Sequence, residues 1–226
     1  MSKITWDETG KKLFETGVDR GVLYLRDEQG AYTNGVAWNG LTAVNESPSG
    51  ADPNNLWADN IKYLTLRGAE EFGASIEAYT YPDEFKECDG SATLAKGATI
   101  GQQTRKTFGF CYRTLVGNDV KGDAYGYKLH LIYGCSASPS EKGYSTKNDN
   151  PDAITFNWTI TTTPVNVTGF QPTACITVDS TTCDPEKLAA LEKVLYGEGT
   201  GEGTSGNTAP KLPLPDEVKS ILGEAA

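Results

Sequence analysis

The strongest constraint on the fold is an alternation of side chains in the segment "DAITFNWTITTTPV", residues 152–165. Its large apolar members are Ile154, Phe156, Trp158 and Ile160. The residues between them are small, polar and uncharged, namely Thr155, Asn157, Thr159 and Thr161. Successive side chains of a strand point to opposite faces, so this segment predicts a strand with one buried face and one uncharged polar face.

Further strand patterns follow one another along most of the chain. Residues 105–119 and 124–135 are separated by a polar, glycine-containing turn and predict an antiparallel hairpin. Other strands are expected within residues 20–30, 32–46, 61–68, 73–82 and 173–180. The fold class predicted is mainly β: two packed antiparallel sheets, as a sandwich or barrel, with one flanking helix and an extended loop and terminal arms.

The single strong helix signal lies late in the chain, at residues 185–196. Asp184 is a suitable N-cap, Pro185 a suitable first residue, and Gly197 a suitable end. The chain is therefore divided into an N-terminal arm (1–17), a β domain that includes this helix (18–197), and a flexible linker with a C-terminal tail (198–226).

Two segments between the strands lack a strong strand pattern. Residues 47–60, rich in Pro, Gly, Asn and Asp, predict a long loop whose apolar members are Leu56 and Trp57. Without a local element to pack on, this pair is interpreted as an anchor for a partner surface. Residues 82–90 predict one or two helical turns.

Composition excludes several classes of protein. A net charge of −10 is unfavourable for binding nucleic acid through its phosphates. No apolar stretch is long enough to span a bilayer, and no signal peptide is visible. The five cysteines are widely spaced without a CxxC pair, so we expect reduced thiols and neither a metal site nor a cofactor.

No constellation of catalytic residues is recognisable, so no enzymatic activity is expected. The only histidine, His130, fits an ordinary strand position. Asp83, Glu84 and Glu87 lie at an expected helix start, where carboxylates favour the dipole. The aromatic content leaves a carbohydrate-binding β-sandwich as the alternative, although Trp158 is expected in the core.

Three segments together resemble the major tail protein of long-tailed bacteriophages, the subunit of the tail tube. They are "TGVDRGVLYL", the region from "YGYKLHLIYGC" to "ITFNWTITTTPV", and "DPEKLAALEKVLYG" followed by "PKLPLPDEV". The likeness extends over nearly the whole chain in the same order. It implies hexameric rings whose sheets line a continuous inner barrel, and which stack through a long loop and terminal arms. The chain departs from larger family members in having too few residues after the helix for a further C-terminal domain.

The resemblance also implies partners and sites. The partners would be other copies of the chain, the tape measure, tail terminator and distal tail proteins, and DNA in passing contact, within a virion tail assembled in the host cytoplasm. The stacking loop would use Asp52, Asn55, Leu56, Trp57 and Asp59. The lumen candidates are Glu77, Thr155, Asn157, Thr159 and Thr161, and Leu212 and Leu214 would make tail contacts.

Charge agrees with such a conduit. Six copies of a −10 chain carry about −60, so the ring would not bind a passing polyanion. The uncharged face of residues 152–165 is suited either to a channel wall or to packing on a neighbouring subunit. Arg105, Arg113 and Lys128 are expected in ion pairs at subunit interfaces. Deleting residues 52–58 is expected to leave folding intact and to block ring stacking.

Overall fold

The fold was analysed in a computed structural model, which describes residues 4–147, 149, 152–199 and 208–223. The strands of the body are β1 (Leu13–Arg26), β2 (Tyr32–Trp38), β3 (Leu41–Glu46), β8 (Gly73–Ala78), β11 (Phe108–Asn118), β12 (Gly122–Ala137), β13 (Phe156–Thr162) and β14 (Cys175–Asp179). The projecting pairs are β4 (Ser49–Gly50) with β7 (Glu70–Glu71), β5 (Pro53–Ala58) with β6 (Ile61–Arg67), and β9 (Ala92–Ala95) with β10 (Ala98–Ile100). The helices are a 3-10 helix (Asp83–Glu87), α1 (Pro185–Tyr196) and α2 (Pro215–Leu222).

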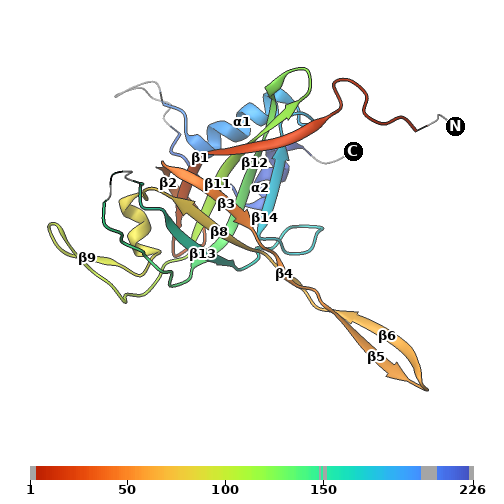
Figure 1. Cartoon of the computed structure of the whole chain (residues 1–226), viewed down its shortest axis with the longest axis horizontal. Coiled ribbons are helices and arrows are strands. Elements are labelled where there is room, and N and C mark those ends of the chain that lie inside the picture. The colour runs from red at the N-terminus through yellow and green to blue at the C-terminus, as the bar shows by residue number, and fades with distance from the viewer. Residues whose placement is uncertain (1–3, 148, 150–151, 200–207, 224–226) are drawn as a thin grey trace.

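The body strands form one antiparallel sheet in the order β2-β1-β11-β12-β13-β8-β3, and β14 also pairs with β12 (Figure 1). β12 changes partner along its length, from β14 at residues 128–132 to β13 at residues 135–137. Between them Gly134 has φ of 60°, and a Cβ here would lie 2.2 Å from the Thr163 carbonyl oxygen. Only glycine tolerates this bend, which folds β13, β8 and β3 over the first strands.

Two apolar clusters fill the spaces between layers. One lies between the folded halves of the sheet, where the Trp38 ring centroid is 5.5 Å from those of Trp158 and Phe110. The other lies on the opposite face of β1, β11 and β12, against Leu188, Leu191 and other residues of the helices. The prediction of a mainly β fold of packed antiparallel layers with a flanking helix is confirmed.

Local patterns predict most of the elements well. Helix α1 has the predicted bounds, and the Asp184 carboxylate accepts hydrogen bonds from the backbone N–H groups of Glu186 and Lys187. The predicted central hairpin is β11 with β12. The strand within residues 152–165 is the shorter β13, with Trp158 and Ile160 buried and Asn157, Thr159 and Thr161 exposed.

The N-terminal arm is shorter than predicted. Leu13 to Gly17 already belong to β1, where they pair with β11. Before the strand, the Gly10 N–H donates to Asp119 and its carbonyl accepts from Asn118. Only the part of the arm before Gly10 extends from the body (Figure 1), and residues 1–3 lie outside the described range.

The described part of the C-terminal segment is packed on the body, which differs from the predicted flexible linker and tail (198–226). The Leu212 N–H donates to the Tyr32 carbonyl of β2 at 3.0 Å, and the Gly35 N–H donates to the Pro210 carbonyl at 2.9 Å. Leu212 is 2% exposed and Val218 3%, because both pack into the helix-side core. Residues 200–207 and 224–226 of the predicted linker and tail lie outside the described residues.

Candidate assembly surfaces

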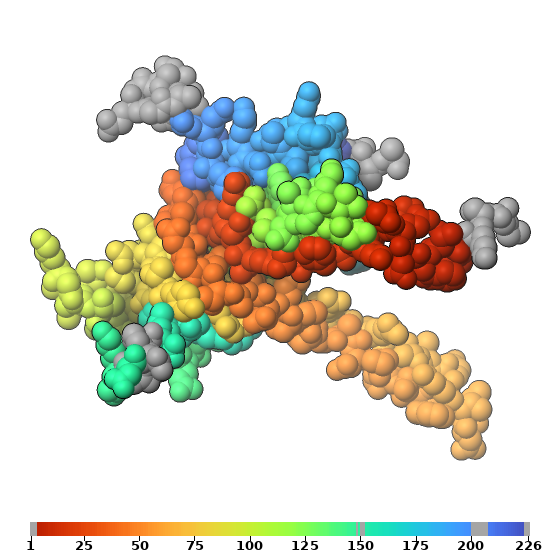
Figure 2. Space-filling view, turned by 45° about the horizontal axis from the view of Figure 1, so that its top comes forward, coloured from red at the N-terminus to blue at the C-terminus, as the bar shows by residue number. Residues whose placement is uncertain are grey.

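A long β-hairpin extends from the body where a loop was predicted. β4 and β7 form its base, and β5 and β6 form its outer part, which stands clear of the rest of the molecule (Figure 2). Asp59 and Asn60 form its two-residue turn with φ of 51° and 60°, the left-handed values that a type I′ turn requires. The prediction of a loop at residues 47–60 was wrong because Ser49–Gly50 and Pro53–Ala58 are strands, whereas the strand predicted within residues 61–68 is β6, which pairs with β5. The Asp-Asn pair between apolar segments was the signal that could have identified the hairpin.

One face of this hairpin is apolar and uncovered. Leu56 lies opposite Leu64, and Leu66 lies two residues further along β6, so the three side chains share a face. They are 40%, 46% and 49% exposed. On the opposite face the Thr65 hydroxyl donates to the Asn55 carboxamide at 2.9 Å.

The predicted stacking residues lie along this hairpin from base to tip. Asp52 immediately precedes β5, Asn55, Leu56 and Trp57 belong to β5, and Asp59 is in the turn. Trp57 is 69% exposed, as are Ile61 (62%) and Tyr63 (70%) on the strand that the sequence-based prediction did not include in this surface. A two-stranded hairpin with so much exposed apolar surface is marginally stable alone in water, so it is suited to a partner.

A second surface is the outer face of β13, β8 and β3. Four of the five lumen candidates gather in the paired strands there, namely Glu77, Asn157, Thr159 and Thr161. The fifth, Thr155, is exposed directly before β13. The Asn157 amide donates to the Glu77 carboxylate at 3.1 Å, and Asn45 and Ser75 extend the polar surface towards β3. Among the paired strand residues of this face, Glu77 is the one that carries a charge.

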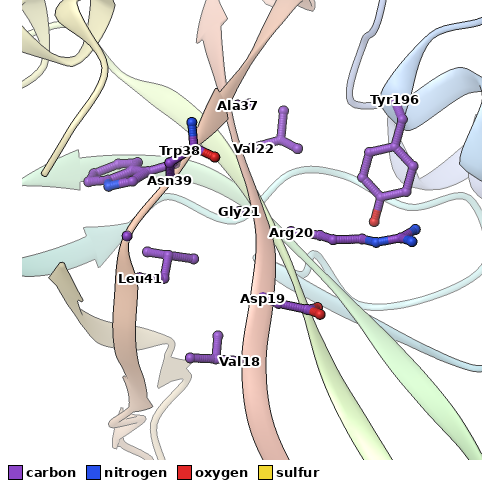
Figure 3. Close-up of a pocket in the computed structure, with 11 residues that line it drawn as sticks. Val18, Asp19, Arg20, Gly21, Val22, Ala37, Trp38, Asn39, Leu41 and Tyr196 are labelled. Atoms are coloured by element: carbon purple, nitrogen blue, oxygen red, sulfur yellow. The ribbon is translucent and has the colours of Figure 1, made fainter. Parts of the chain in front are cut away.

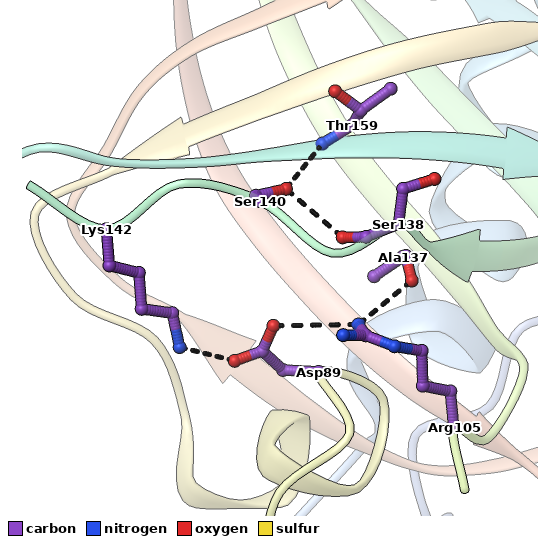
Figure 4. A network of polar contacts seen from close by, with 7 residues as sticks. All are labelled: Asp89, Arg105, Ala137, Ser138, Ser140, Lys142 and Thr159. Atoms are coloured by element: carbon purple, nitrogen blue, oxygen red, sulfur yellow. Dashed lines mark hydrogen bonds and ion pairs between the residues drawn. The ribbon is translucent and has the colours of Figure 1, made fainter. Parts of the chain in front are cut away.

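The three basic residues expected at subunit interfaces are paired within the chain instead. Arg113 donates two hydrogen bonds to the Asp19 carboxylate, at 2.7 and 2.6 Å, and thereby holds the pKa of Asp19 below its usual value. Lys128 pairs with Glu15. Arg105 lies 3.7 Å from the Asp89 carboxylate, which Lys142 also contacts (Figure 4).

The Asp89 network connects three segments of the body. Asp89 is 8% exposed, so its charge needs both cations close to it. Arg105 also donates to the Ala137 carbonyl at the end of β12, at 3.0 Å (Figure 4). These contacts hold the segment after β12 in place beside the 3-10 helix, which indicates a structural role for the network.

A hollow lies at the end of β3 that is remote from the hairpin (Figure 3). It encloses about 580 Å³ between β1, the turn from β2 to β3, and the last residue of α1. Its lining includes Val18, Arg20, Ala37, Leu41 and Tyr196. Arg20 has a φ of 50° within a β-bulge of β1, and its guanidinium lies over the Tyr196 ring, 5.9 Å from the centroid.

The histidine considered as a catalytic group, His130, contacts several neighbouring side chains in the sheet. The His130 ring stacks on Tyr112 with centroids 4.5 Å apart, and its Nε2 atom is 3.0 Å from the Thr114 hydroxyl. The His130 Nδ1 atom, 3.4 Å from the Glu46 carboxylate, and the Tyr112 hydroxyl, which donates to it at 2.6 Å, hold the pKa of Glu46 below its usual value. This group packs at the edge of the inter-layer core.

The acidic cluster and the thiols are also accounted for by local structure. Asp83 and Glu87 of the 3-10 helix pair with Lys86 and Lys106. Burial raises the pKa of the Cys88 and Cys111 thiols to about 12, so both are protonated at neutral pH and are poor nucleophiles. Within the described ranges, no three His, Cys, Asp or Glu side chains are grouped as metal ligands.

Leu212 and Leu214, both expected to contact other tail proteins, have different environments in the structure. Leu212 is buried in the chain's own core, so it is not available to a partner, whereas Leu214 is 42% exposed.

In the part of the chain that the structure describes, no helix combines the length and apolarity needed to cross a bilayer.

A scan against protein-family models finds no match for this sequence, and a search of curated proteins finds none either.

Proposed function

We propose that the chain is a self-assembling structural subunit that forms stacked hexameric rings, the tube of a bacteriophage tail through which DNA passes. The observation that carries this proposal is the projecting β5–β6 hairpin with its uncovered apolar face. An apolar surface on an extended two-stranded arm gains most from burial against another molecule. The sequence resemblance to tail tube subunits supplies the identity of the assembly.

The outer face of β13, β8 and β3 supports the same proposal. Hydroxyl and amide groups carry no positive charge, so such a face does not release counterions from DNA or retain it. In the proposed tube this face is the lumen wall, and packing against a neighbouring subunit is the other arrangement that its polarity allows. Other tail proteins would contact the ends of the stack.

The test is electron microscopy of the purified full-length protein at high concentration, with two matched variants. Changing Leu56, Leu64 and Leu66 together to Ser removes the apolar face, and we expect it to abolish tubes while leaving a folded subunit. Changing Asn55 and Thr65 to Ser on the opposite face is the control and should preserve tubes. Deleting residues 52–58 alone removes only one strand of the hairpin, so the face substitutions are the cleaner test.

A wild-type chain that remains monomeric at every protein and salt concentration would contradict the proposal. So would tubes of normal length from the Leu-to-Ser variant.

Carbohydrate binding is the alternative function, and the exposed rings of Trp57 and Tyr63 favour it because aromatic faces can stack on sugars. Binding to a glycan array that is lost on Trp57→Ala, from a protein that does not assemble, would support this alternative over the tube.

A further inference from the structure

The hairpin and the hollow lie at opposite ends of the same strand. β3 starts at Leu41, which lines the hollow, and ends at Glu46, from which the chain continues into the hairpin. Figure 1 shows the hairpin extending away from the body beyond this end. From Glu46 to Ala58 the chain covers about 40 Å at ~3.3 Å per residue, roughly twice the length of β3. The tip therefore points away from its own hollow and can reach that of a copy placed in line.

The hollow is located where the folded sheet does not close. β3 ends the path of hydrogen-bonded strands, and the first part of β1, up to Asp19, pairs with β11 alone. The two strands approach closely at Gly21, where a Cβ would lie 2.5 Å from Leu41 Cδ1. Because β3 and the first part of β1 do not pair with each other, an open groove remains beside their edges. Its partly exposed apolar side chains are Val18, Ala37 and Leu41.

One charged group at the hollow and one at the hairpin tip are of opposite sign, Arg20 and Asp59, although Lys62 opposite Trp57 adds a cation to the tip. The Asp19 carboxylate is neutralised by Arg113, so Arg20 supplies the hollow's excess charge. None of the ion pairs formed among the described residues includes Arg20 or the tip residue Asp59. The bulge gives Arg20 a left-handed backbone that a residue other than glycine adopts only at a cost in free energy. Such bulges reorient a side chain, and here Arg20 points from β1 towards the Tyr196 ring at one rim of the hollow (Figure 3).

We propose that this hollow receives the hairpin tip of a second copy of the chain, with Trp57 against Val18 and Leu41 and the Asp59 carboxylate beside Arg20. The proposal rests on the proposed function, which supplies a stack of identical subunits, and it identifies the surface on the receiving subunit. Because donor and receiver are different surfaces, the contact is heterologous and leaves a free hairpin at one end and a free hollow at the other. Addition of subunits is then open-ended and has a direction.

The test is a charge exchange measured by the extent of assembly in sedimentation and electron microscopy. We expect Asp59→Arg and Arg20→Glu each to raise the protein concentration needed for assembly by about tenfold or more, since each places like charges together. The double variant should recover most of the wild-type assembly. Glu70→Arg, on β7 at the base of the hairpin, and Arg26→Glu, at the far end of β1, are matched controls that should change little.

A second measurement does not depend on the charge variants folding. Ala37→Cys in the hollow and Ala58→Cys at the tip, combined in one chain, should give a ladder of disulfide-linked oligomers under mild oxidation of assembled protein. Each single variant is the control for links through the native cysteines. Tubes that form without this ladder, or without coupling between Asp59 and Arg20, overturn the inference while the proposed function stands. A wild-type chain that never assembles overturns both.

Discussion

At the scale of single residues, the ion pair between Arg113 and Asp19 connects two neighbouring strands of the sheet. Arg113 on β11 is packed between Asp19 of the neighbouring strand and the ring of Tyr127, 5.2 Å from its centroid. Since guanidinium stays charged at all relevant pH values, the hydrogen-bonded Asp19 carboxylate is favoured in its ionised form. The pair holds β1 against β11 directly beside the bulge at Arg20.

This pair predicts an acid-sensitive contribution to stability. The folded pKa of Asp19 lies below its unfolded value of about 3.9, so the contribution is complete above that value and is lost as the pH falls through the lower folded pKa. Asp19→Asn should lower the free energy of unfolding by about 1 kcal/mol at neutral pH, a figure that allows for partial exposure of the carboxylate.

Urea unfolding of the monomer at about pH 6 and about pH 2.5 measures this effect. The difference between wild type and Asp19→Asn should be smaller at the acidic pH. Asp52→Asn, an exposed carboxylate at the hairpin base, is the control and should have little effect at either pH. An equal loss at both pH values for Asp19→Asn would contradict the role assigned to the pair.

At the scale of elements, the C-terminal segment is part of the fold. It runs along the edge of β2 and then forms α2, and the Tyr133 hydroxyl of β12 donates to the Pro213 carbonyl at 2.9 Å. An exposed β2 edge would offer unpaired backbone groups to other chains. Because the segment hydrogen-bonds to β2, those backbone groups are not available to another chain.

Two leucines of this segment give a matched comparison. Leu212→Ser should lower the free energy of unfolding by about 3 kcal/mol, because it removes a buried side chain and introduces a hydroxyl into the core. Leu214→Ser, at the largely exposed position two residues later, should cost less than about 1 kcal/mol. Thermal or urea unfolding measures both, and similar losses for the two variants would show that the segment is not docked in solution.

At the scale of the whole molecule, acidic charge and an uncharged face act together. The chain carries −10, yet the outer face of β13, β8 and β3 presents mainly hydroxyl and amide groups. In the proposed tube, an acidic subunit would repel DNA at long range, and the polar face would offer no cation to phosphate at short range. This arrangement agrees with the proposed conduit, in which DNA would pass without being bound.

This distribution predicts that lysines added to the outer face of β13 create affinity for DNA, whereas lysines added elsewhere on the molecule do not. Changing Thr159 and Thr161 together to Lys should make assembled tubes retain DNA, with retention falling steeply as salt is raised. Thr99→Lys combined with Thr93→Lys adds the same charge on the β9–β10 hairpin and should not do so. The measurement is the amount of labelled DNA that sediments with the tubes. Equal amounts for the two variants would argue against a lumen position for this face.

The sequence by itself determined the elements that depend on neighbouring residues. The alternation in β13, the hairpin of β11 and β12, and the cap and bounds of α1 all follow from periods and capping residues within a few positions. The uncharged face of residues 157–161 was predicted for the same reason, since parity along one strand places these side chains together.

The tertiary structure decided which surfaces are free and which are covered. Leu212 and Leu214 have the same side chain and similar neighbours in sequence, but only Leu212 meets β2 and the helix-side core. Likewise, Arg20 and Leu41 line one hollow because the sheet bends at Gly134 and brings β3 back beside β1. Burial is a property of contacts between segments distant in the chain, and such contacts depend on packing of the complete sheet rather than on any local pattern.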